Sequence, residues 1–162
     1  MQTLLPVAQQ VAHLLRERAE TIAVAESSTG GLVSAALLAV PGASAYFLGG
    51  AVVYTARARR RLTGISNEAM ADMRSSSEPY ALLLARTSRD NFRATWGLAE
   101  TGAAGPSGNR YGDAAGHTCL ALSGPVEESL TLETGMTDRL ANMRLFAAAA
   151  LNLLLKHLSN RP

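Results

Sequence analysis

Three short polar segments of this sequence contain the hydroxyl groups, arginines and glycines from which a small-molecule site is built. Ser27–Gly31 has three hydroxyl side chains followed by two glycines, and Tyr54–Arg61 has a tyrosine followed by four arginines. Thr101–Gly108 places three glycines among small residues. Each segment lies at the end of a run that is typical of a strand. Because ligands of open α/β sheets bind beyond the carboxyl ends of the strands, the three segments are predicted to converge on one site.

Ser27–Gly31 lies between a predicted strand and a predicted helix, where backbone N–H groups lack partners and the helix dipole is positive. This geometry suits a phosphate or an oxyanion. The alternative is that the hydroxyl residues only cap the helix, while Gly30 and Gly31 only pack closely against the sheet. The spacing leaves both interpretations open. The segment matches neither the P-loop pattern nor GxGxxG, which disfavours a mononucleotide kinase and a dinucleotide-binding domain.

Other chemistry-bearing residues point to simpler roles. The basic run Arg57–Arg61 has no aromatic residues between its arginines to stack bases, so it predicts a short helix with a solvated face and no nucleic-acid partner. Cys119 lies in the apolar run Thr118–Leu122 and is predicted to be a buried strand thiol. The three histidines are far apart, and neither CxxC nor HExxH occurs. No protein metal site is therefore expected.

The elements that must position these segments alternate between helix and strand. With 162 residues, of which 48% are hydrophobic, the chain is expected to form one domain over residues 1–162. Interspersed strands and helices with a final hairpin predict the α/β class, a three-layer α/β/α sandwich with a mixed, mostly parallel sheet. The predicted helices are 4–15, 32–38, 56–62, 67–73, one from about 79 to 93, and 138–158; the predicted strands are 21–25, one within 45–54, 95–101, 116–122 and 129–134, with a glycine-rich loop at 102–113.

The start of the chain, its apolar runs and its charge predict where the protein is located and which partners it has. Met1–Pro6 lacks the basic region and apolar core of a signal peptide, and no apolar run reaches the roughly 20 residues that a membrane helix needs. The formal net charge is only +2. A cytoplasmic protein without a membrane partner is expected. The apolar faces of the terminal helices favour a homo-oligomer.

Several motifs, in matching order and spacing over nearly the whole chain, closely resemble the CinA C-terminal domain family, the nicotinamide-nucleotide amidohydrolases. No one of these motifs is as specific as their combination. The resemblance implies the fold of that domain in a stand-alone form, a homo-oligomer and a small-molecule nucleotide substrate, with no cofactor and no metal. The motifs are Ala25-Glu26-Ser27-Ser28-Thr29-Gly30-Gly31, Val40–Ser44, Phe47–Gly50, Val53-Tyr54 and Thr101–Gly108.

The resemblance implies hydrolysis of the carboxamide of nicotinamide mononucleotide to nicotinate mononucleotide and ammonia, as in pyridine-nucleotide salvage. It implies Ser27 as nucleophile, with Tyr54, Thr101 and an activating residue five positions after that tyrosine, which here is Arg59. An arginine near the start of the last helix, Arg139 or Arg144, also belongs to the implied site. The residues expected to bind substrate are Ser28, Thr29, Gly30, Gly31, Gly102, Gly105, Ser107, Gly108, Arg139 and Arg144.

Arg59 departs from the family pattern, in which a lysine occupies that position. Lysine loses its proton when buried and then acts as a base, whereas arginine stays charged in proteins. The sole lysine, Lys156, lies near the end of the chain. Two readings follow: an amidohydrolase in which Tyr54 or a water takes the serine proton, or a catalytically altered or inactive paralogue that binds or regulates through nucleotides.

Overall fold

The computed structural model describes residues 1–161 and contains one sheet with the strand order β2-β1-β3-β4-β5. β1 pairs in parallel with β2 and β3, whereas β3–β4 and β4–β5 are antiparallel pairs. Two of the four pairings are therefore parallel, and all strands except β4 run in the same direction. The strands are β1 (Ile22–Glu26), β2 (Phe47–Val52), β3 (Trp96–Ala103), β4 (His117–Ser123) and β5 (Glu127–Glu133).

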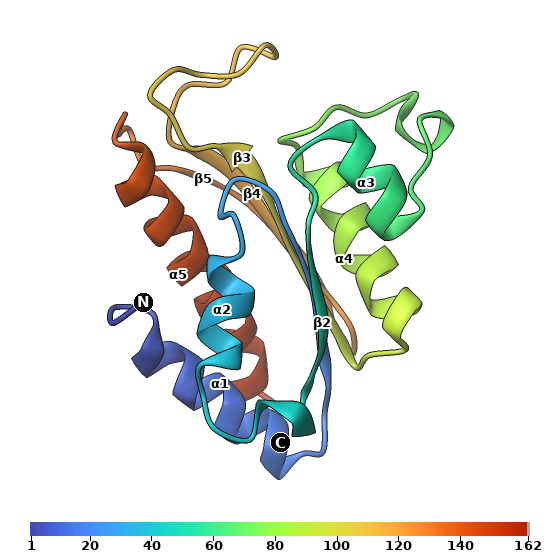
Figure 1. The fold of residues 1–162 in the computed structure, drawn as a ribbon, viewed down its shortest axis with the longest axis vertical. Helices are drawn as coiled ribbons and strands as arrows, with labels where there is room; N and C mark the ends of the chain where they lie inside the picture. Colours follow the sequence, from blue (N-terminus) through green and yellow to red (C-terminus); the bar gives the residue numbers. More distant parts are fainter. Residues whose placement is uncertain (162) are drawn as a thin grey trace.

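Helices cover both faces of the sheet (Figure 1). α1 (Leu5–Glu17), α2 (Leu32–Leu38) and α5 (Arg139–Ser159) lie on one face, and α3 (Ala56–Thr63) and α4 (Glu78–Phe92) lie on the other. This arrangement confirms the predicted three-layer α/β/α sandwich with a mixed sheet. The parallel strands β2, β1 and β3 end at the same edge, next to the glycine-rich loop that joins β3 to β4 and extends beyond the sheet in Figure 1.

The core explains why these segments form these elements. Every residue of β1 is buried, because helices cover the central strands on both faces. In α1 the buried residues are Ala8, Val11, Ala12 and Leu15, the three- and four-residue spacing that predicted the helix. Burying a large aliphatic or aromatic side chain contributes about 1.5–3 kcal/mol, so these stripes hold the helices on the sheet.

Some element bounds differ from the sequence prediction. The segment 67–73, expected to be a helix, contains only the short 3-10 turn Glu68–Met70. β3 continues to Ala103, two residues beyond the predicted strand. Gly102 pairs with Thr118 of β4, and Ala103 pairs with His117 of the same strand. Local sequence predicted a loop there, and the tertiary pairing with β4 makes it strand.

Candidate active site

Two adjoining cavities open where β1, β2 and β3 end. The larger has a volume of about 650 Å³ and is lined by Ser27, Tyr54, Arg59 and Thr101. The structure therefore brings together the three polar segments that the sequence predicted to converge. The smaller cavity, about 290 Å³, shares Tyr54, Gly102 and Asn109 with the larger one. Of the residues predicted to bind substrate, it is lined by Ser28, Gly102, Gly105, Ser107, Gly108 and Arg139.

Two buried glutamates hold the turn that carries Ser27. Glu100 of β3 accepts hydrogen bonds from the backbone N–H of Ser27 at 3.1 Å and of Thr29 at 2.9 Å. It also accepts from the hydroxyl groups of Ser28, Thr29 and Thr118. The carboxylate is 1% exposed, so these donors supply the stabilisation that water would otherwise give.

Glu26, at the end of β1, performs the capping role that the sequence assigned to the hydroxyl residues. Its carboxylate accepts from the backbone N–H groups of Gly31, Val33 and Ser34, at 2.8–3.0 Å. Gly31 is the N-cap residue of α2 and has no side chain to cap it. The alternative interpretation, in which the hydroxyl residues cap the helix, is therefore wrong. A carboxylate at the start of a helix also complements the helix dipole.

The same contacts correct the expectation that the turn offers a row of free N–H groups to an anion. Thr29, Gly30 and Gly31, which were predicted to bind substrate, line neither cavity. The Thr29 hydroxyl is buried between the two glutamates, within 2.9 Å of an oxygen of each. Gly30 and Gly31 adopt φ of 64° and 99°, a region that glycine enters without strain, so they shape the turn.

Arg139, and not Arg144, lies at the site. Its guanidinium donates to the carbonyl oxygen of Gly105 at 2.7 Å and to the hydroxyl oxygen of Tyr54 at 3.2 Å. It thereby links α5, the glycine-rich loop and the residue that follows β2. Arg144 is exposed and lines neither cavity. Five residues along a helix turn a side chain by about 140°, which points Arg144 away from the position of Arg139.

Arg59 is buried, with 5% of the residue exposed, although it belongs to the basic run that the sequence placed on a solvated face. The other arginines of that run are exposed. The Nε of Arg59 donates to the carbonyl oxygen of Ile65 at 3.3 Å, and Nη2 donates to Oδ1 of Asn67 at 2.6 Å. Both acceptors are neutral. No carboxylate of residues 1–161 forms an ion pair with this guanidinium. Burial raises the pKa of Tyr80, and the charge of Arg59 and its hydrogen bond with Tyr80 offset part of that rise.

Lys156 does not replace the missing lysine. It lies in the last turn of α5, 17 residues after Arg139, which corresponds to about 25 Å along a helix. Its Nζ pairs with Glu128 at 2.8 Å. The Ser27 hydroxyl accordingly has Tyr54 and Thr101, and no lysine, among the residues that line its cavity.

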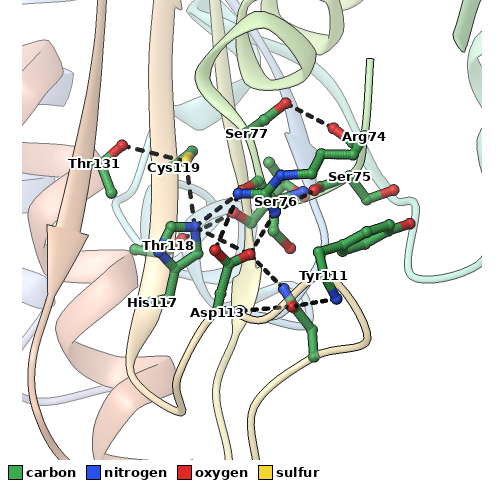
Figure 2. Close-up of polar contacts among 12 residues, drawn as sticks. Arg74, Ser75, Ser76, Ser77, Tyr111, Asp113, His117, Thr118, Cys119 and Thr131 are labelled. Carbon is green, nitrogen blue, oxygen red and sulfur yellow. Dashed lines mark hydrogen bonds and ion pairs between the residues drawn. The ribbon is translucent and has the colours of Figure 1, made fainter. Parts of the chain in front are cut away.

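A chain of hydrogen bonds connects Thr101 to His117 through Ser76, which lies just before α4. Figure 2 shows Ser76 and His117 next to each other. The Thr101 hydroxyl accepts from the Ser76 N–H at 3.2 Å, and the Ser76 carbonyl oxygen lies 2.9 Å from Nε2 of His117. Nδ1 of His117 bonds Glu133 of β5. Burial by itself lowers the pKa of His117, but Glu133, the Ser76 carbonyl and the charge of Asp113 outweigh burial and raise it.

Asp113 fastens the glycine-rich loop beside the larger cavity. Figure 2 shows its carboxylate between Arg74 and His117. Arg74 Nη2 donates to Asp113 Oδ1 at 3.0 Å, and Asn109 donates to the other carboxylate oxygen at 2.8 Å. The hydrogen bond from Arg74 is the main cause that lowers the pKa of Asp113. Tyr111 lies against the guanidinium of Arg74, 5.4 Å from its ring centre.

Sequence reasoning missed Glu100, Arg74 and Asp113. Glu100 carried a readable signal, because a charged residue directly after the apolar run Trp96–Ala99 mirrors Glu26, which directly follows the apolar residues of β1. Arg74 and Asp113 are 39 positions apart and meet only through the fold. Cys119 was interpreted correctly: it is buried, and burial raises the pKa of its thiol.

Comparisons with known proteins agree on one family. Residues 4–158 match the model of the CinA C-terminal domain. A CinA-like protein of Myxococcus xanthus is 39% identical over 153 residues, which cover 94% of this chain and 36% of that protein. A CinA-like protein of Desulforapulum autotrophicum is 35% identical over 156 residues, covering 95% of this chain and 37% of that protein. The chain thus spans about a third of the length of these relatives.

Solved structures give the same result. A competence-damaged protein (CinA) superfamily protein from Klebsiella pneumoniae superposes with a TM-score of 0.90 at 25% identity, over 98% of this chain and 99% of that one. The competence/damage inducible protein CihA from Agrobacterium tumefaciens gives 0.88 at 27% identity, over 97% and 96%. Within residues 1–161, no helix combines the length and apolar character needed to cross a bilayer.

Proposed function

We propose that this chain, which belongs to the CinA C-terminal domain family, hydrolyses the carboxamide of nicotinamide mononucleotide to nicotinate mononucleotide and ammonia. The observation that carries the proposal is the shared cavity of Ser27, Tyr54 and Thr101, whose volume of about 650 Å³ suits a nucleotide. No acidic side chain of residues 1–161 lines it, while three arginines do, which favours an anionic substrate.

The proposed reaction begins with attack of the Ser27 hydroxyl oxygen on the carboxamide carbon. An amide is a poor electrophile, so the attack needs an activated hydroxyl and a stabilised oxyanion. The serine proton passes to Tyr54 or to a water and then to the departing nitrogen, which leaves as ammonia when the C–N bond breaks. Water hydrolyses the resulting acyl-serine ester and regenerates Ser27. Glu100 and Glu26 act as positioning residues, because they fix the turn without lining the cavity.

Arg59 favours a second candidate function, nucleotide binding without turnover. A guanidinium remains charged under protein conditions, so Arg59 cannot accept the serine proton as a neutral lysine would. Its hydrogen bonds to Ile65 and Asn67 hold it in place as a fixed cation. A protein that retains the cavity and has lost the base would bind the nucleotide and release it unchanged.

Ammonia release from nicotinamide mononucleotide distinguishes the two functions. The wild-type protein is expected to release ammonia, and Ser27→Ala is expected to lower the rate at least about a hundredfold, because the nucleophile is removed. Ser44→Ala is the matched control, since Ser44 is exposed and lines neither cavity. Absence of ammonia from the wild type, together with calorimetric binding of the nucleotide, would reject hydrolysis and support the second function.

A further inference from the structure

Arg59 and Arg139 lie in two adjoining cavities, and no carboxylate of residues 1–161 pairs with either guanidinium. We propose that the two cavities together select a nucleotide that carries an acid group at each end. A carboxylate on the base lies beside Arg59, and the phosphate lies beside Arg139. The site then binds nicotinate mononucleotide, the acid, more tightly than nicotinamide mononucleotide, the amide.

The burial of Arg59 gives the stronger evidence for an acidic ligand group. Removing a guanidinium from water is costly unless an opposite charge compensates it. The groups that contact Arg59 are the Ile65 carbonyl, the Asn67 side chain and the Tyr80 hydroxyl, and none of them is a carboxylate. The other arginines of the larger cavity differ from it. Arg74 is neutralised by Asp113, and Arg110 is exposed and donates to the hydroxyl group of Tyr111. An anionic ligand group is the partner that Arg59 lacks.

The smaller cavity suits a phosphate. Arg139 lines it together with the backbone of Gly102–Gly105 and with Ser107 and Gly108, where few side chains obstruct a ligand. Gly105 has φ of 116°, which favours glycine over any other residue. An arginine recognises phosphate through paired N–H groups, and the serine hydroxyl adds a donor. Tyr54 borders both cavities, so one ligand reaches from Arg59 to Arg139 across it.

The preference for the acid follows from charge. It rests on the proposed function for the class of nucleotide and for placing the base near Ser27. A carboxylate forms charge-assisted hydrogen bonds with a guanidinium, and these are roughly twice as strong as bonds to a neutral group. A carboxamide offers one neutral oxygen and presents an NH₂ group that repels the cation. The position of Arg59 thus makes the pocket retain the acid form, which would inhibit turnover or allow the protein to sense that nucleotide.

Isothermal titration calorimetry with four ligands tests the proposal. The ligands are nicotinamide mononucleotide, nicotinate mononucleotide and the two corresponding ribosides without phosphate. The wild type is expected to bind the acid nucleotide at least about tenfold more tightly than the amide nucleotide. Arg59→Gln is expected to abolish that preference while changing the affinity for the amide nucleotide less than about threefold. Arg139→Gln is expected to weaken both nucleotides equally and to leave the ribosides unaffected.

Two further variants make the result interpretable. Arg60→Gln removes an exposed arginine from the same helix and is expected to change no affinity. Arg59→Met removes the charge but keeps a side chain of similar length, and it is also expected to abolish the acid preference, which covers the case in which Arg59→Gln fails to fold. Equal wild-type affinity for the acid and the amide would overturn the proposal. So would an Arg59→Gln variant that weakens both nucleotides equally but not the ribosides, because Arg59 would then contact the phosphate.

The binding test is independent of hydrolysis, because nicotinate mononucleotide has no carboxamide to cleave. An acid preference without ammonia release would reject the proposed hydrolysis and support this inference. Ammonia release without an acid preference would support the proposed hydrolysis and reject this inference.

Discussion

At the scale of single residues, the site depends on carboxylates that do not line it. Glu26 and Glu100 are 0% and 1% exposed and together accept hydrogen bonds from the backbone around Ser27 and from the hydroxyl of Thr29. A charged acceptor with several donors is favourable in a buried position only while every donor is in place. Ser27 therefore owes its position to side chains on two strands.

Replacing Glu100 with Gln is expected to destabilise the protein by about 2–4 kcal/mol. The two N–H groups of Ser27 and Thr29 would lose their charged acceptor, and the new amide NH₂ would face existing donors. Urea unfolding at pH 7 measures the change. Glu17→Gln, on the exposed face of α1, is the control and is expected to stay within about 0.5 kcal/mol. Equal stability of the two variants would show that Glu100 does not hold the turn.

At the scale of elements, α4 packs unusually close to β3. A Cβ atom at Gly97 would overlap the carbonyl oxygen of Ala85, a backbone atom of α4. This close contact sets the depth at which α4 lies on the sheet. The residues just before α4, including Ser76, then reach Thr101 and His117. Gly97 thus lets α4 lie close to β3, and this position brings Ser76 to the wall of the larger cavity.

Gly97→Ala is expected to destabilise the protein by about 2–4 kcal/mol, because the backbone of α4 has to move away from β3. Gly49→Ala is the matched control. The three atoms nearest to its new Cβ all belong to the ring of Phe92, a side chain that is 47% exposed and has solvent to move into, so a loss below about 1 kcal/mol is expected. Urea denaturation of both variants measures the difference. A larger loss for Gly49→Ala would contradict the close packing of α4 and β3.

At the scale of the whole molecule, charged groups connect the sheet, the segment before α4 and the glycine-rich loop. His117 of β4 contacts Glu133 of β5, the Ser76 carbonyl before α4, and Asp113 of the glycine-rich loop. Both ring nitrogens face oxygen acceptors, so both must carry protons to donate. The charged imidazolium is the form that this arrangement stabilises, in agreement with the raised pKa of His117.

The contribution of His117 to stability is therefore expected to depend on pH. Its pKa is raised in the folded protein, so the contribution is fully present below the unfolded value of about 6.5 and is lost as the pH rises through the folded value. The stability difference between wild type and His117→Gln should shrink from pH 5.5 to pH 9 in urea unfolding experiments. Gln9→Ala, at an exposed position with no titratable group, should leave the profile unchanged. A difference that grows with pH would refute the charged state of His117.

The sequence alone determined the class and order of the elements, because periodic burial is a local property that each segment displays by itself. The apolar run of β1, the spaced apolar residues of α1 and the glycines of the turn after β1 were all interpretable in isolation. The family resemblance and the convergence of three strand ends also followed from it, since parallel strands end at one edge of a sheet.

The tertiary structure alone decided how the site is held and charged. Whether Arg139 or Arg144 reaches the cavity depends on the rotation of α5, and whether Arg59 is solvated depends on where Ile65 and Asn67 fold back over α3. The same holds for Glu100, whose five donors come from separate strands and turns. Desolvation and pairing of charges depend on distances between residues remote in sequence, and no local pattern encodes those distances.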